Sequence, residues 1–185
     1  MILRVLALEA RFPLAFEEAV ISAAKESGLS RSSIWSIIRQ ESAFNHQARS
    51  YVGAKGLMQL MPRTASAVAK SLNMRSRHPD LFSPEINVRL GSTYLAQMKE
   101  RFGSLALAAA AYNAGPHRVS RWLGRTTFEI PEAWVEAIPF NETRRYVQQV
   151  MAFMAVYEWR QSKTPGSMIA RIGREVEKVS LNELQ

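Results

Sequence analysis

The stretch IIRQESAF, residues 37 to 44, places a glutamate, Glu41, in a segment that otherwise has the pattern of a buried helix face. Residues three and four apart are neighbours on a helix, so Ile34, Ile37, Ile38, Glu41 and Phe44 are predicted to share one face. Burying an ionised carboxylate is costly, and desolvation is therefore expected to raise the pKa of Glu41. An acid still protonated near neutral pH can act as a general acid. The alternatives are pairing with a buried arginine, or a place at the helix end in contact with water.

A helical pattern extends in both directions from this stretch. Apolar residues recur with a helical period, and serine, glycine and proline stand at the ends of most segments. The pattern predicts helices over residues 14–27, 30–44, 62–72, 83–102, 104–114, 117–124 and 141–160, with a short helix around Trp134. The fold is therefore expected to be mainly α.

The stretch SYVGAKGLMQLM, residues 50 to 61, interrupts the helical pattern. Two glycines three residues apart, with β-forming and apolar neighbours, predict a tight turn and short strands. We therefore expect a small β-hairpin region near residues 50–61, which makes the predicted class α+β with helices dominant.

Length and composition are those of one globular domain. The chain has 185 residues, of which 47% are hydrophobic and 22% charged. The character changes after Arg160, so we predict a domain over residues 1–162 and a linker with a basic amphipathic tail over residues 163–185. The apolar stripe of that tail is expected to pack on the domain or to fray, and the alternative is a helix lying on a membrane surface.

The formal charge of +8 indicates an anionic partner, which can be nucleic acid, a membrane surface or an acidic polymer. There are no cysteines, so disulfides and thiolate chemistry are excluded, while the cellular compartment stays open. The three histidines are scattered, and no glycine-rich phosphate loop is present, so we expect no metal and no other cofactor. No run approaches the roughly 18 apolar residues of a membrane span, and no stable membrane insertion is expected. Residues 1–10 do not have the pattern of a signal peptide.

Two further stretches carry polar residues suited to a sugar ligand. In GLMQLM, Gln59 offers an amide and Met61 a soft apolar contact, and the alternative is a core segment with one exposed amide. In AYNAG, Tyr112 and Asn113 end an apolar helix and can line a cleft. Their alternative roles are a buried, hydrogen-bonded tyrosine and a helix stop.

The stretch IPFNETRRYV, residues 138 to 147, places Glu142, Arg144 and Tyr146 at a predicted helix start. A carboxylate is favourable near the positive end of a helix, so a purely structural role for Glu142 and Arg144 is an equal alternative to a functional one.

Taken together and in this order, IRQESAFN, SYVGAKGLMQLMPRTA, AAYNAGPHRV and IPFNETRRYV resemble the catalytic domain of the soluble lytic transglycosylases, lysozyme-like enzymes that cut peptidoglycan. The resemblance covers about residues 12–160. Two departures are small: His46 stands where a proline is common, and Asn141 where a serine is common. Family members often carry a long helical N-terminal region, so an excised catalytic domain or a short member is expected.

The resemblance implies cleavage of the β-1,4 bond between N-acetylmuramic acid and N-acetylglucosamine, with closure of a 1,6-anhydro ring. It assigns Glu41 as the catalytic acid and then base. It also assigns the substrate-binding residues Ser50, Gln59, Met61, Tyr112, Asn113, Glu142 and Tyr146, with Arg144 a weaker candidate.

The implied partner is a peptidoglycan glycan strand, met by a monomer in the periplasm or cell envelope. One rival is a goose-type lysozyme hydrolase that uses Glu142 as a second carboxylate, and another is a peptidoglycan-binding module without activity. A nucleic-acid binder fits the charge but leaves GLMQLMP and AYNAG unexplained, so nucleic acid is not expected as a partner.

Overall fold

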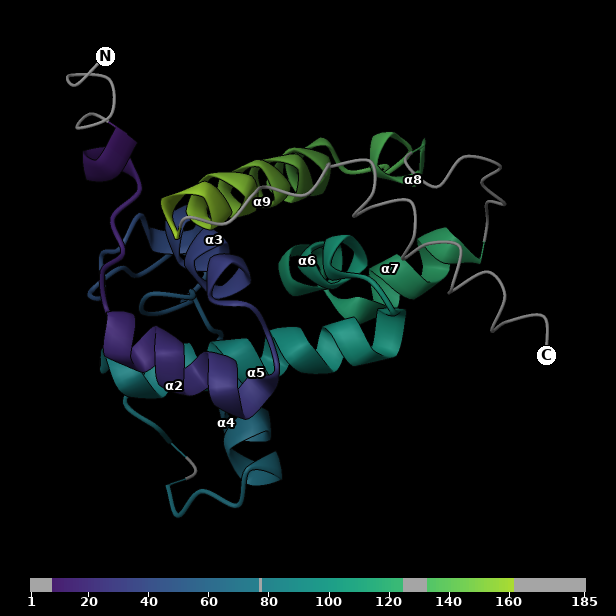
Figure 1. Ribbon diagram of the computed structural model, residues 1–185. Helices are drawn as coiled ribbons and strands as arrows, with labels where there is room; N and C mark the ends of the chain where they lie inside the picture. Colours follow the sequence, from purple (N-terminus) through teal and green to yellow (C-terminus); the bar gives the residue numbers. More distant parts are fainter. Residues whose placement is uncertain (1–7, 77, 125–132, 162–185) are drawn as a thin grey trace.

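The structure is a computed structural model, and it describes residues 8–76, 78–124 and 133–161. Helices dominate the described residues, which confirms the prediction of a mainly α fold (Figure 1). In chain order the elements are α2 (Glu17–Ser27), α3 (Arg31–Ser42), α4 (Pro62–Ser71), α5 (Pro84–Phe102), α6 (Leu105–Ala114), α7 (Pro116–Leu123), α8 (Ala133–Glu136) and α9 (Asn141–Arg160). The predicted tail over residues 163–185 lies outside the described residues, and the proposed boundary near residue 162 stays a prediction.

The helix ends follow the local signals of the sequence. The side chains of Ser30, Ser83 and Ser104 each accept a hydrogen bond from the backbone N–H three residues further on, at 3.1, 3.4 and 3.1 Å. These bonds satisfy N–H groups that have no partner within the helix. Gly28 and Gly103 end α2 and α5 in the left-handed conformation, with φ of 71° and 75°.

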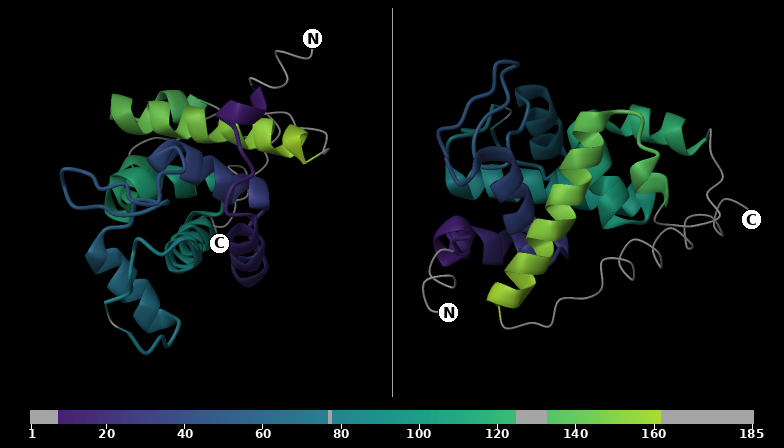
Figure 2. Two further views of the ribbon diagram at one scale, coloured as in Figure 1. Left: turned by 90° about the vertical axis from the view of Figure 1, so that its left-hand side faces the viewer. Right: turned by 90° about the horizontal axis from the view of Figure 1, so that it is seen from above.

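The core surrounds α3, which is packed by α9 and by α2 (Figure 2). Ile34, Trp35, Ile37 and Ile38 are fully buried. The alanine-rich helix α6 packs against α5, α7 and α9, and its residues 105–111 are all buried. Small side chains allow α6 to sit close to three neighbours at once, so this helix forms the centre of the domain.

One feature of α3 differs from the prediction. The helix ends at Ser42, because Ala43 and Phe44 both adopt left-handed backbone conformations, with φ of 48° and 69°. Phe44 therefore does not continue the helix face, although it packs against the core from outside the helix. As a result Glu41 lies in the last turn of α3, where its carboxyl group reaches the edge of the core.

The predicted β-hairpin near residues 50–61 is wrong. In the described part of the chain this region contains isolated bridges, between Arg49 and Lys55 and between Lys55 and Leu60, instead of paired strands. The reason is local. Two tight turns, closed by Gly53 N–H to Ser50 O at 3.0 Å and by Gln59 N–H to Gly56 O at 3.1 Å, leave too few residues between them for a ladder.

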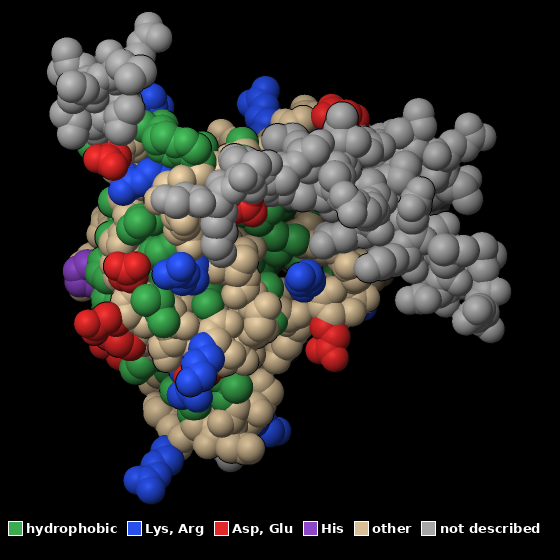
Figure 3. Space-filling view, viewed as in Figure 1, with side chains coloured by type: hydrophobic (Ala, Val, Ile, Leu, Met, Phe, Trp, Pro, Cys, Tyr) green, Lys and Arg blue, Asp and Glu red, His purple; other side chains and the backbone are tan. Residues whose placement is uncertain are grey.

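The surface of the described residues has mixed charge on the face shown in Figure 3, where basic and acidic side chains are interspersed. The positive excess of the chain therefore does not mark a binding surface on this face. No helix in the ranges 8–76, 78–124 and 133–161 is both long enough and apolar enough to cross a bilayer.

Candidate active site

The candidate site is built around the carboxyl group of Glu41. The preceding turns of α3 are anchored in the core by Ile37 and Ile38, so the helix cannot rotate to expose the residue further. Glu41 itself is half-buried, and it forms no ion pair in the part of the chain that the structure describes. This excludes pairing with a described arginine, one of the two structural alternatives that the sequence left open. The other alternative holds in part, because Glu41 lies in the last turn of α3 and is only half-buried.

Tyr146, on another helix, hydrogen-bonds this carboxyl group. Its hydroxyl donates a hydrogen bond of 2.7 Å to Oε1 of Glu41, and it comes from α9, which packs directly on α3. Tyr146 is buried, and burial and the neighbouring carboxylate raise its pKa well above the ordinary value. The phenol therefore stays neutral near neutral pH and can donate this hydrogen bond.

The pKa of Glu41 is raised to about 7. Burial is the main cause, because it disfavours the charged form, and the negative charge of Glu142 adds to it. The hydrogen bond from Tyr146 acts in the opposite direction, because it stabilises the carboxylate. Glu41 is consequently balanced between its two protonation states near neutral pH, so its carboxyl group can both donate and accept a proton there.

Glu142 lies one turn before Tyr146 on α9, so both residues face the same side of that helix. It is exposed, and its effect on the pKa of Glu41 is the observation that connects it to the site. Arg144, between them in sequence, donates 2.9 Å to the backbone oxygen of Glu136 and also bonds Asn141. Arg144 therefore supports the start of α9, and it makes no hydrogen bond or ion pair with Glu41.

Tyr112 and Asn113 are brought to the same region by the end of α6. The hydroxyl of Tyr112 donates 2.8 Å to the backbone oxygen of Met58, and Asn113 Oδ1 accepts 2.7 Å from the hydroxyl of Thr143. Burial, then the charge of Glu41, raise the pKa of Tyr112 well above the ordinary value. These two side chains thus join α6 to the loop before α4 and to α9, next to the carboxyl group.

The loop between α3 and α4 carries the other predicted residues. Ser50 accepts 2.9 Å from the N–H of Ala54, so its hydroxyl shapes the turn. Gln59 has φ of 46°, and its Nε2 donates to the oxygens of Ala48 and Gly56 at 3.1 and 2.8 Å. Met61 is exposed just before α4. Of these three, Met61 presents the most free surface to a ligand, and the other two order the loop.

Two family models match the chain. The model described as Transglycosylase SLT domain matches residues 18–135, and the one described as Soluble lytic transglycosylase helical domain matches residues 137–165. The chain belongs to the SLT transglycosylase family. The contact between Glu41 and Tyr146 joins the two matched segments, since α9 lies in the second one.

Relatives with curated names agree with this. The soluble lytic murein transglycosylase of Salmonella typhimurium is 45% identical over 81% of this chain and 24% of its own length, and the enzyme of that name from Escherichia coli K12 is 41% identical over 88% and 26%. Among solved structures, an inactive mutant of the lytic transglycosylase Slt from Pseudomonas aeruginosa superposes with a TM-score of 0.81 at 44% identity. The superposition covers 85% of this chain and 26% of the Pseudomonas aeruginosa chain. The chain spans about a quarter of the length of these relatives.

Reasoning from the sequence missed one residue that organises this SLT domain. Asn87 of α5 is fully buried, and it accepts 2.8 Å from Met58 N–H while donating 2.9 and 2.8 Å to the oxygens of Lys55 and Leu81. Asn87 could have been identified from the sequence as a polar residue beside the apolar stripe of a predicted helix. Asn87 fixes the segment around Met58, on which Tyr112 in turn bonds.

Gly56 belongs to the same arrangement. Its φ is 77°, and a Cβ atom there would lie 2.0 Å from the backbone oxygen of Leu81. Only glycine allows the loop to approach α5 this closely, which explains why the motif has a glycine at this position.

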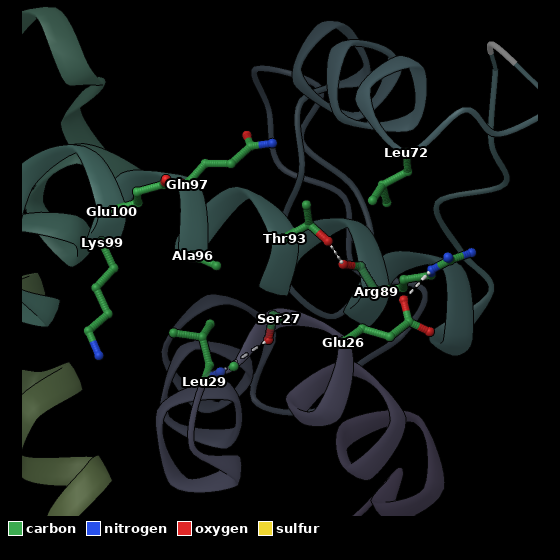
Figure 4. A pocket seen from close by; sticks show the side chains of 11 residues that line it. Glu26, Ser27, Leu29, Leu72, Arg89, Thr93, Ala96, Gln97, Lys99 and Glu100 are labelled. Carbon is green, nitrogen blue, oxygen red and sulfur yellow. Dashed lines mark hydrogen bonds and ion pairs between the residues drawn. The ribbon is translucent and has the colours of Figure 1, made fainter.

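A hollow in the SLT domain lies away from Glu41. It has a volume of about 710 Å³ and is formed where the end of α2 meets α5, with Leu72 at its edge (Figure 4). The ion pair of Glu26 and Arg89, 2.7 Å between Oε2 and Nε, crosses its wall. Glu41 does not line it, and the ion pair of Glu26 and Arg89 occupies part of its wall, so this hollow is not the candidate active site.

Proposed function

We propose that this chain is a peptidoglycan lytic transglycosylase, which cleaves the β-1,4 bond between N-acetylmuramic acid and N-acetylglucosamine and leaves a 1,6-anhydro end. The observation that carries the proposal is a half-buried Glu41 with a pKa of about 7, oriented by the hydroxyl of Tyr146. Family membership and the names of the relatives support the substrate class.

In the proposed reaction Glu41 is protonated at the start and gives its proton to the glycosidic oxygen as the bond to the anomeric carbon breaks. The resulting carboxylate then takes the proton of the C6 hydroxyl of the muramyl residue. That oxygen bonds to the anomeric carbon and closes the ring, so no water is consumed. An attacking group tethered to the substrate has a high effective concentration, which explains how one carboxylate can be sufficient.

The remaining residues have supporting roles in this proposal. Tyr146 positions the carboxyl group, and Tyr112 and Asn113 keep the end of α6 in place beside it. Met61 and Glu142, which are exposed, contact the sugars directly. Ser50 and Gln59 order the loop that borders the glycan strand, through their hydrogen bonds within the loop. They can also hydrogen-bond to the strand.

The proposal is tested by product analysis on purified sacculi. We expect the parent chain to release muropeptides with 1,6-anhydro ends, which mass spectrometry distinguishes from reducing ends by the mass of one water. Glu41→Gln should fold and lose turnover by about 100-fold or more, since general acid-base catalysis typically contributes 10²–10⁴-fold. A folded Glu41→Gln that cleaves at nearly the parent rate would rule out the assignment.

A hydrolase of the goose-type lysozyme class is the second candidate, because the charge of Glu142 reaches Glu41. In that case Glu142 activates a water, the products carry reducing ends, and Glu142→Gln abolishes cleavage. For a transglycosylase, Glu142→Gln keeps anhydro products. Binding to sacculi without release of any soluble fragment would instead indicate a binding module.

The proposed setting is the periplasm or cell envelope, where peptidoglycan lies, and the proposed state is a monomer. Sedimentation of the purified chain, with and without soluble glycan fragments, tests the second point.

A further inference from the structure

The tip of the loop between α3 and α4 carries two apolar side chains in an unusual place. Tyr51 is fully exposed and Val52 is 71% exposed. Tyr51 makes no hydrogen bond, ring contact or ion pair with any residue that the structure describes. They are the central residues of the turn closed by Gly53 N–H and Ser50 O, positions that usually carry Gly, Pro, Asn or Asp. Local preference is violated there, as is common at functional positions.

This turn is firmly held. Besides the closing bond, Ser50 N–H donates 3.0 Å to Ala54 O, and Ala54 N–H donates 2.9 Å to the hydroxyl of Ser50. Gly53 has φ of 92°, a conformation that glycine adopts without strain. A ring on such a turn loses little conformational freedom when it meets a ligand, because tyrosine has two side-chain torsions and the backbone is already ordered.

The turn is also tied to the candidate active site. Ala48, just before it, accepts hydrogen bonds from Gly56 N–H at 2.9 Å and from the side chain of Gln59 at 3.1 Å. Met58, in the same segment, bonds the hydroxyl of Tyr112. In both views of Figure 2 this loop lies at the same end of the molecule as the first half of α9, which carries Tyr146. The tip therefore extends the surface that begins at Glu41.

Two cations flank the two apolar residues. Arg49 and Lys55 lie on either side of the turn, and neither forms an ion pair within the described ranges, although Nζ of Lys55 lies 5.7 Å from the centroid of the Phe82 ring. Apolar surface bordered by positive charge is complementary to a glycan strand, whose sugar rings have an apolar face and whose muramyl residues carry carboxylates. Such a strand is the occupant that the charge favours.

We propose that Tyr51 is a substrate-positioning residue: its ring packs against the face of a sugar in the glycan strand, beyond the bond held at Glu41. The proposal rests on the proposed function, because it takes the same strand as its ligand. Tyr51 does not touch the reacting atoms. It therefore contributes to binding of long strands and leaves the chemical step unchanged.

Binding is measured with Glu41→Gln as the background, so that the glycan is not consumed. The variants Glu41→Gln, Glu41→Gln/Tyr51→Ala and Glu41→Gln/Tyr51→Phe are titrated against purified sacculi. Packing one face of an aromatic ring corresponds to a loss of about three- to tenfold in affinity for the alanine variant. The phenylalanine variant keeps the ring and should bind like the background. All three should unfold at the same temperature, because the side chain of Tyr51 packs on nothing.

Kinetics on active protein give the second readout. Tyr51→Ala should raise KM by a similar factor on long glycan strands, with kcat unchanged and no effect on a fragment of two disaccharide units. Equal affinity of the alanine and parent tyrosine forms, or a change confined to kcat, would overturn the inference. The inference would also be overturned if Tyr51→Ala lost binding to anionic lipid vesicles while keeping its affinity for sacculi. If the Glu41→Gln background with Tyr51 intact fails to bind sacculi, the proposed function falls as well, and that result is distinguishable from a failure of Tyr51 alone.

Discussion

Replacing Glu41 by glutamine should change the stability of the protein in a pH-dependent way, independently of any assay of activity. The pKa of this carboxyl group is raised from 4.5 to about 7 in the folded state. A raised pKa means that the group's contribution to stability is fully present below pH 4.5 and is lost as the pH rises to about 7. Above pH 7 the folded protein must hold a carboxylate that it desolvates, whereas the unfolded chain solvates it freely.

The magnitude follows from the same values. The difference between 4.5 and about 7 corresponds to about 3 kcal/mol, at 1.36 kcal/mol per pH unit. Part of the side chain stays in water, which screens the charge, so a penalty between about 1 and 3 kcal/mol is expected at pH 8. Glutamine is neutral at every pH, and its amide oxygen can still accept the hydrogen bond from Tyr146. The variant should therefore be more stable than the parent by that amount at pH 8, and by less than about 1 kcal/mol at pH 5.

Urea unfolding at pH 5 and pH 8, followed by circular dichroism, measures this difference. Glu100→Gln is a matched control, because Glu100 is exposed on α5 and its side chain makes no hydrogen bond or ion pair with the described residues. It should give the same small change at both pH values. If Glu41→Gln stabilises the protein equally at pH 5 and pH 8, or destabilises it at pH 8, the carboxyl group is not desolvated, and the reasoning from burial to a neutral acid is refuted.

Four other changes test the surroundings of this group. Tyr146→Phe removes a bond that favours the carboxylate, so the pKa of Glu41 should rise and the alkaline limb of the kcat/KM profile should move up by about one pH unit. Tyr112→Phe, which removes a bond to a backbone oxygen instead, should leave that limb unmoved. Asn87→Ala should lower the free energy of unfolding by about 3 kcal/mol or more in urea, because several buried polar groups lose their partner together. Gly56→Ala should reduce the melting temperature by several degrees, since its Cβ would overlap a backbone oxygen at a φ that disfavours alanine; an unchanged melting temperature would contradict the packing described for this loop.

Local chemistry explains why most helices could be predicted. Ser30, Ser83 and Ser104 cap the helices that they precede, and Gly28 and Gly103 end the ones that they follow. These interactions join residues within one helical turn, so they can be predicted from the local sequence. The same local reasoning fails for residues 50–61, where β-forming residues predict strands that the structure does not contain. Their backbone bonds are used in turns and in contacts with Asn87, which lies far away in the sequence.

The sequence by itself determined that Glu41 interrupts an apolar helix face. This position predicted a pKa raised by burial, while pairing with an arginine and exposure at the helix end stayed open as alternatives. The sequence did not determine which residue would orient the carboxyl group. Tyr146 stands 105 positions away, and only the packing of α9 on α3 brings its hydroxyl to 2.7 Å. The physical reason is that desolvation follows from a residue's own position in a helical pattern, while a directed hydrogen bond depends on the relative placement of two helices, which is decided by how the whole core packs.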